Sequence, residues 1–290
     1  MNRSALINAT TAFSENERKA LLNLLSDEDP AVYDAVRKRL VASGGAATPW
    51  LRPHVLSTDP VLRRHARDIL LYFDRQENDN AFLTFCLTQS ADFDLERAAW
   101  MLAETRYPEI NPAGYRALLD SYAADLREQI DPAAPPQQIL AACNQYLFDR
   151  QGFKGNEQNY YDPENSYLNR VFDRKLGNPI SLCVLYLLLA KRLRLPMTGI
   201  GLPGHFMVRY QTARVELYVD AFNKGKLLTK QDCIKYLVQT HHNLEDGHLA
   251  PVTSRRILLR ICAGLHQIYS QAGDLTEAPR LQRYLIALAK

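Results

Sequence analysis

Residues 177–196 read GNPISLCVLYLLLAKRLRLP, and this stretch decides the expected fold. It is among the most apolar parts of the chain, so it predicts a buried helix that begins near Asn178 or Ser181. The basic residues of its last turn suit the negative end of a helix dipole, and Pro196 ends the helix. Cys183 lies near the start of this helix, as either a small core residue or a nucleophile.

The segments that follow predict short β-strands. MTGIGLPGHFMVRY (residues 197–210) and RVELYVDAF (residues 214–222) place β-branched and apolar residues between turn residues. We therefore expect the buried helix to pack on an antiparallel sheet. From residue 254 the pattern returns to two helices joined at QAGDL, which predicts an αα-hairpin. The expected fold class is α+β and mostly helical.

The N-terminal part predicts helices that recur weakly along the chain. Asp-Pro pairs stand at residues 29–30 and 59–60, thirty residues apart. Each pair can begin a helix, because aspartate caps exposed N–H groups and proline suits the first turn. Asp92 is the expected cap of a third helix. A helical unit of this length resembles HEAT-like solenoid repeats, although an irregular helical bundle would give the same pattern.

A proline cluster marks the expected domain boundary. The segment QIDPAAPPQQIL (residues 129–140) interrupts the helical pattern. After one more helix, the polar segment QGFKGNEQNYYDPENSY (residues 151–167) predicts a shaped loop, because it is irregular and rich in Asn and Tyr. We therefore expect a helical domain before this boundary and the helix-and-sheet core after it.

The composition argues against several classes of function. With 290 residues, 47% of them hydrophobic and 23% charged, the chain is an ordinary globular protein, and its net charge of +3 does not indicate nucleic-acid binding. It carries no Walker loop, dinucleotide fingerprint or H-E-x-x-H motif, so we expect no cofactor. His241, His242 and His248 lack the i, i+4 spacing of a helical metal pair, so we expect no metal.

The cysteines and the N-terminus predict a cytoplasmic protein. Five cysteines are spread along the chain without a C-x-x-C pair, which argues against a disulfide framework and against a zinc ribbon. The first twenty residues lack the apolar region of a signal peptide. The longest apolar run, residues 182–190, is far shorter than the ~20 residues that span a bilayer, so we expect no membrane partner.

Three residues follow one another in an order that suits thiol catalysis. Such catalysis needs an ionisable sulfur, an imidazole within hydrogen-bond reach and a third group that orients the imidazole. Cys183 near a helix start, His205 on the first strand and Asp220 on the next strand fit this plan. Each also has a structural interpretation, as a core thiol, a strand-end hydrogen bonder and a turn cap respectively.

The segments NSYLNRV, GNPISL, GLPGHF and DAFNKGKLL resemble, in order and spacing, those of the SirB-like family, a branch of the transglutaminase-like superfamily. The N-terminal helices and the C-terminal hairpin are also usual for that family, so the resemblance covers most of the chain. It implies a HEAT-like helical domain over residues 1–130, a papain/transglutaminase-like core over residues 131–250 and a tetratricopeptide-like helical tail over residues 251–290.

The resemblance also implies cysteine-dependent acyl transfer or amide hydrolysis, through a thioester that an amine or water resolves. Cys183 would be the nucleophile, His205 the general acid and base, and Asp220 the orienting carboxylate. Backbone N–H groups at the helix start, with the side chain of Asn165, could hold the oxyanion, and Tyr161 could line the cleft. Asn165 could equally cap the following helix, and Tyr161 could hold the loop in place.

One departure from the family pattern favours a different function. In active transglutaminase-like cores the nucleophilic cysteine opens the helix directly after a Gly-x pair. Here Pro179 follows Gly177 and Asn178, and Cys183 lies one turn further along the helix, ~6 Å away. We therefore expect a cleft-bearing scaffold with a degenerate catalytic core that binds a protein or peptide. The alternative is the acyl transferase or amide hydrolase, and the sequence does not predict the oligomeric state.

Overall fold

A computed structural model describes residues 13–240 and 247–290 of the chain. Residues 1–12, together with His241 and His242, lie outside the described residues. The described part forms two compact units. The first unit holds residues 13–81 and 104–109, and the second holds residues 82–103 together with the described residues from 110 to 290.

Helices with aspartate caps form the first unit. Asp29 Oδ1 accepts a hydrogen bond from Ala31 N at 2.8 Å, and Asp59 Oδ1 accepts one from Val61 N at 2.9 Å. Both Asp-Pro pairs therefore begin helices as predicted, and the apolar faces of these helices meet in one core around Leu40. The segments are α1 (Glu15–Leu25), α2 (Pro30–Val41), α3 (Thr48–Leu51), η1 (Arg52–Leu56) and most of α4 (Pro60–Thr88).

The second unit contains the remaining helices, and one of their caps differs from the prediction. Asp94 Oδ1, and not Asp92, accepts the backbone N–H of Arg97 at the start of α5, at 3.0 Å. Asp92 instead accepts a hydrogen bond from Ser254 N at 3.3 Å. The helical segments are α5 (Leu95–Arg106), α6 (Pro112–Gln129), α7 (Pro136–Asn144), η2 (Gln145–Arg150), η3 (Pro163–Asn165), α8 (Leu168–Arg174), α9 (Pro179–Leu193), α10 (Lys230–Gln239), α11 (Ser254–Gln271) and α12 (Glu277–Leu288).

The apolar stretch at residues 177–196 forms α9, which is buried on nearly all sides. Asn178 caps its start by accepting the N–H of Ser181 at 2.9 Å, and Arg194 ends it in the left-handed conformation. Eleven of its 15 residues are buried, which explains why apolar side chains surround the whole helix. Across the described parts of the chain, neither α9 nor any other helix is both long and apolar enough to cross a membrane.

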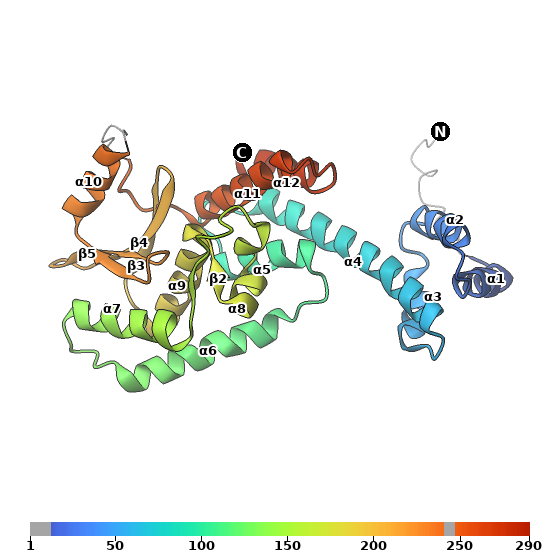
Figure 1. Cartoon of the computed structure of the whole chain (residues 1–290), viewed down its shortest axis with the longest axis horizontal. Helices are drawn as coiled ribbons and strands as arrows, with labels where there is room; N and C mark the ends of the chain where they lie inside the picture. The colour runs from blue at the N-terminus through green and yellow to red at the C-terminus, as the bar shows by residue number, and fades with distance from the viewer. Residues whose placement is uncertain (1–12, 241–246) are drawn as a thin grey trace, which may run out of the picture. The chain divides into compact units, whose positions relative to one another are not determined.

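A four-stranded antiparallel sheet follows α9, as predicted, and α9 packs on it. Figure 1 shows α9 and α10 at opposite sides of these strands. The mostly helical α+β fold, with a buried helix on an antiparallel sheet, is therefore confirmed. In spatial order, the strands are β3 (Met197–Leu202), β4 (His205–Gln211), β5 (Glu216–Asp220) and β6 (Lys226–Leu228).

The register of β4 and β5 decides which side chains share a face of the sheet. Val208 pairs with Val219, and side chains alternate along each strand, so Met207 and Asp220 both lie on the opposite face. His205, two residues before Met207, belongs to that same face. This is the face that packs on α10. The strand pairing thus brings the predicted imidazole and carboxylate to one side of the sheet.

Two further features complete the second unit. The parallel pair of β1 (Lys154–Gly155) and β2 (Leu176–Gly177) joins the loop at residues 151–167 to the start of α9. Helices α11 and α12 form the predicted αα-hairpin at the C-terminal end. Inside this hairpin, Arg280 and Glu277 form an ion pair whose side chains are about nine-tenths buried.

Candidate functional site

His205 and Asp220 form a close pair at the end of the sheet. His205 is the first residue of β4, and Asp220 is the last residue of β5. The Nε2 atom of His205 lies 2.9 Å from Oδ2 of Asp220, and the two side chains are only 10% and 7% exposed. The Nε2–H bond is poorly aligned with this oxygen, so the approach is a short polar contact and not a linear hydrogen bond. The structure thus brings these two predicted site residues together.

The carboxylate of Asp220 is held in its ionised form by His205 and by the turn that follows Asp220. Asn223 donates its backbone N–H to Oδ1 at 3.2 Å and its side-chain Nδ2–H to Oδ2 at 2.8 Å. Burial acts to raise the pKa of Asp220, but His205 and Asn223 together outweigh burial, so the pKa lies below its ordinary value. Asp220 therefore contacts the imidazole and also caps the turn, the two roles that the sequence offered as alternatives.

The thiol of Cys183 has a different partner. Its Sγ lies 3.4 Å from the backbone carbonyl oxygen of Phe206, to which it donates, and the residue is 0% exposed. Because Phe206 follows His205 directly in β4, their side chains point to opposite faces of the sheet. The structure therefore places Cys183 against the strand that carries His205, with a backbone oxygen as the hydrogen-bond acceptor of the sulfur.

The surroundings of Cys183 oppose ionisation of the thiol. Burial raises its pKa well above the ordinary value, and the negative charge of Asp220 adds to this. The backbone N–H of Ala221 and the charge of Arg260 act in the opposite direction but are outweighed. A thiolate nucleophile requires the reverse balance, because the thiolate and not the thiol attacks a carbonyl.

Two adjoining pockets open beside His205, and their volumes are about 740 Å³ and about 310 Å³. Tyr160, Pro179, Gly204 and His205 line both of them, and we call the two together the His205 groove. The part of α9 that reaches the groove is its first turn, with Pro179 at the helix start. Cys183, one turn further along, is not among the described residues that line it.

Asn165 is fully buried inside the loop that precedes α9. Its Nδ2 donates to the carbonyl oxygens of Asn159 and Tyr160, at 2.8 and 3.2 Å, and its Oδ1 accepts a hydrogen bond from Asn156 at 2.9 Å. Its backbone oxygen accepts a hydrogen bond from Ser181 Oγ at 2.6 Å, at the start of α9. The structure thus uses Asn165 to shape the loop and join it to the helix, and its oxyanion role stays a prediction.

Tyr161 lies at the mouth of the smaller pocket of the His205 groove. Its side chain is largely exposed, and its ring stands edge-on to that of Tyr160, with 5.2 Å between the ring centroids. An exposed phenol beside an apolar pocket can pack on a ligand and also donate a hydrogen bond to it. Tyr161 is therefore placed to line a cleft, while Tyr160 forms part of the wall behind it.

Arg260 of α11 is a site residue that the sequence patterns did not indicate. Its Nη2 donates to the carbonyl oxygens of Leu202 and His205, the latter at 2.6 Å, so it holds the β3–β4 turn. Burial lowers the pKa of Arg260, although the nearby phenols of Tyr160 and Tyr236 act to raise it. Arg260 is remote in sequence from the turn that it contacts, so only tertiary packing reveals the connection.

Side chains that bind metals do not cluster at this site. Across residues 13–240 and 247–290, no three His, Cys, Asp or Glu side chains are arranged to hold a metal ion. A ligand in the smaller pocket would instead meet the imidazole of His205, the guanidinium of Arg260 and the phenols of Tyr160 and Tyr161.

Comparison with known protein families gives a match over about half of the chain. The model of the family described as the transglutaminase-like superfamily matches residues 113–263. This range holds His205, Asp220, Cys183 and Arg260, and thus most of the site described above. No solved structure matches the chain.

Curated relatives extend the similarity beyond that range in bacteria. A UPF0162 protein of Xylella fastidiosa (strain 9a5c) is 37% identical over 201 residues, which are 67% of this chain and 71% of that protein. A UPF0162 protein of Pseudomonas aeruginosa is 28% identical over 192 residues, which are 65% of this chain and 69% of that protein. F-box only protein 21 of Homo sapiens is 34% identical over 144 residues, which are 47% of this chain but 22% of that longer protein.

Proposed function

The chain belongs to the transglutaminase-like superfamily, and we propose that its core is a binding scaffold whose His205 groove takes a segment of a protein or peptide partner. In this proposal the helix, the sheet and the His205–Asp220 pair form the frame of the groove. Thiol chemistry plays no part, because the residue at the start of α9 that lines the groove is Pro179 and not a cysteine. The catalytic core is degenerate in this sense.

The position of Cys183 is the observation that carries this proposal. The sulfur is fully buried and donates to the carbonyl oxygen of Phe206, and its surroundings disfavour the thiolate. Pro179 occupies the first helical position, which lines the groove together with His205. Proline has no side-chain group that can attack a carbonyl, so the start of α9 offers no nucleophile to the imidazole.

The lining of the groove supports a peptide as the ligand. Apolar groups such as Pro179 and Ile180 lie beside hydrogen-bonding groups of Tyr160, His205 and Arg260. Ligand sites commonly combine an apolar wall with a few convergent polar groups that fix orientation. The mixture suits a short peptide, whose side chains pack on the wall while its amide groups bind the polar side chains.

Selection from a phage-displayed library of random dodecapeptides tests this function. Gly264 lines the smaller pocket, and an added Cβ would meet no atom within 4 Å there, so a larger side chain fits locally and fills the pocket. We expect the protein and the Gly264→Ala variant to enrich the same sequences, and the Gly264→Trp variant to lose them. Thermal unfolding followed by circular dichroism checks that both variants fold.

Two outcomes would contradict the proposal. In the first, no sequence is enriched on the folded protein. In the second, enriched clones bind the Gly264→Trp variant as well as they bind the Gly264→Ala variant, which would place the binding site away from the groove.

A cysteine-dependent acyl transferase or amide hydrolase is the second candidate, favoured by the contact between His205 and Asp220. An imidazole held by a carboxylate is the arrangement that activates a thiol in such enzymes. In this candidate Cys183 attacks a carboxamide or peptide carbonyl, and Asn165 assists at the oxyanion. It requires a reactive Cys183, so the rate of thiol alkylation separates the two candidates.

We also propose the finer assignments that the sequence suggested. The segments NSYLNRV, GNPISL and GLPGHF support the SirB-like branch of the superfamily. Capped helices in the first unit support a HEAT-like domain over residues 1–130 before a core over residues 131–250, and the α11–α12 hairpin supports a tetratricopeptide-like tail over residues 251–290.

All five cysteines are unpaired, which supports a cytoplasmic location. The match to part of a longer F-box protein supports a core that functions as a module.

A further inference from the structure

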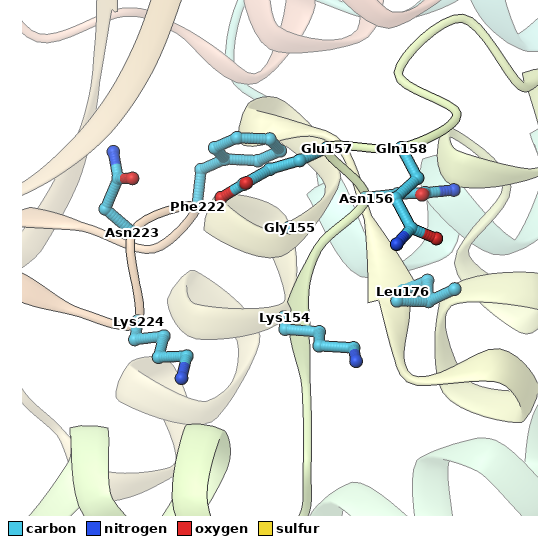
Figure 2. Close-up of a pocket in the computed structure, with 9 residues that line it drawn as sticks. All are labelled: Lys154, Gly155, Asn156, Glu157, Gln158, Leu176, Phe222, Asn223 and Lys224. Atoms are coloured by element: carbon cyan, nitrogen blue, oxygen red, sulfur yellow. The ribbon is translucent and has the colours of Figure 1, made fainter.

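A third pocket, of about 450 Å³, adjoins the two pockets of the His205 groove. Residues of β1 and the loop after it form one wall, and the turn after β5 forms another, as Figure 2 shows. Phe222 and Asn223 line both this pocket and the larger pocket of the groove, so the two spaces adjoin at these residues. We call this third pocket the lysine pocket, after Lys154 and Lys224.

The walls of the lysine pocket are closely packed. A Cβ added at Gly155 would lie 2.6 Å from the ring of Phe222, so the backbone of β1 passes directly against that ring. On the other side of the turn, Asn144 Nδ2 donates to the carbonyl oxygen of Gly225 at 2.6 Å. Lys224 adopts a left-handed backbone conformation with φ of +54°, which is uncommon for a residue other than glycine. The turn therefore fixes the backbone of Lys224, from which the side chain starts.

The charges that line this pocket are out of balance. Lys154 and Lys224 are exposed, and neither has a carboxylate within ion-pair distance among the residues that the structure describes. In Figure 2 both lysines lie at the same end of the pocket, away from the labelled amide side chains. Glu157 is the acidic residue of the described lining, so the two lysines and this glutamate together give the lining a net charge of +1.

Resting on the proposed peptide-binding function, we propose that the lysine pocket binds an acidic side chain of the same peptide, with its carboxylate between Lys154 and Lys224. Because the groove and the pocket adjoin at Phe222 and Asn223, one extended chain that passes over these residues can occupy both. A single net positive charge matches the single negative charge of Asp or Glu better than the double charge of a phosphate group. The ligand class is therefore an acidic peptide.

The same random dodecapeptide library tests this inference when it is selected on three proteins. They are the unaltered chain, the double variant Lys154→Gln with Lys224→Gln, and the control variant Lys230→Gln. Lys230 is also exposed but lines neither the lysine pocket nor the groove. We expect the unaltered chain and the control to enrich sequences with Asp or Glu at one fixed position, and the double variant to lose that enrichment.

A synthetic peptide from the enriched pool then measures the effect by fluorescence anisotropy. Replacing its fixed Glu or Asp by the isosteric Gln or Asn removes the charge without changing the shape. We expect this change to weaken binding to the unaltered chain about fivefold, as for an exposed ion pair, and to have little effect on the double variant.

The outcomes separate failure of this inference from failure of the proposed function. If enriched peptides lack an acidic position but still require the groove that Gly264→Trp fills, the lysine pocket inference is overturned and the scaffold function stands. If no peptide is enriched at all, both are overturned. Free glutamate that displaces the peptide at the same concentration would assign the pocket to small anions. A phosphoserine analogue that binds far more tightly would assign it to phosphopeptides.

Discussion

The Oδ2 atom of Asp220 lies 2.9 Å from Nε2 of His205, and both side chains are about nine-tenths buried on the α10 face of the sheet. The strand register creates this contact, because it brings the ends of β4 and β5 together on that face. His205 also lines the groove, to which α9 presents Pro179. Among the described residues that line the groove, Pro179 thus lies beside His205, whereas Cys183 does not line it.

Cys183 is expected to resist alkylation in the folded protein. The residue is 0% exposed and its pKa is raised by burial, so at pH 8 iodoacetamide cannot reach the sulfur and little thiolate forms to attack the reagent. Peptide mass spectrometry should find Cys183 unmodified under native conditions and fully modified in urea. Rapid native labelling of Cys183 that His205→Ala slows would instead support the cysteine-dependent enzyme.

Replacing Pro179 by cysteine should create a reactive thiol in the groove. Position 179 is the first residue of α9 and lines both pockets with His205, which can accept the thiol proton. Lys230→Cys is the matched control, because Lys230 is the first residue of α10 but does not line the groove. We expect Pro179→Cys to react with iodoacetamide at lower pH than the control, and His205→Ala to remove the difference. Equal pH profiles for the two thiols would show that the imidazole does not reach position 179.

Asp220 should contribute stability that disappears in acid. Its pKa in the folded protein lies below the ordinary value of 3.8, so the ionised carboxylate stabilises the fold above that value. This contribution is lost as the pH falls through the lowered pKa. Urea unfolding should therefore give a constant difference in unfolding free energy between the protein and Asp220→Asn above about pH 5, and a shift in favour of the variant below about pH 4. A shift in the opposite direction would mean that burial, and not His205 and Asn223, dominates the pKa.

Gly225 should tolerate no side chain, whereas Gly273 should tolerate one at modest cost. Both have left-handed backbone conformations, with φ of +75° and +69°. A Cβ at Gly225 would collide with Asn144, which is held by Tyr186, while a Cβ at Gly273 meets nothing within 4 Å. Thermal or urea unfolding should show a loss of about 1 kcal/mol for Gly273→Ala, from backbone strain alone. The loss for Gly225→Ala should be at least about 3 kcal/mol, and equal losses would rule out the collision.

Local patterns predicted those features that depend on residues close in the sequence. The caps at Asp29 and Asp59 were correct because a capping side chain bonds to N–H groups two or three residues away. The third cap was misplaced from Asp94 to Asp92, because both aspartates precede the helix and only the backbone path decides which one faces its N–H groups. Strand β6 was not predicted, since it is too short to show a clear alternation, and helix α10 was not predicted either.

The sequence by itself determined the buried helix, the antiparallel strands after it and the C-terminal hairpin, because apolar periodicity and turn residues report on the local backbone. It also identified His205 and Asp220 as a pair. Only the tertiary structure decided where Cys183 lies relative to that pair. That outcome depends on how α9 packs against β4 and on which face each strand residue occupies, and both are set by contacts between segments that are distant in the chain. The hydrogen bonds from Arg260 to the carbonyl oxygens of Leu202 and His205 likewise depend on contacts between distant segments.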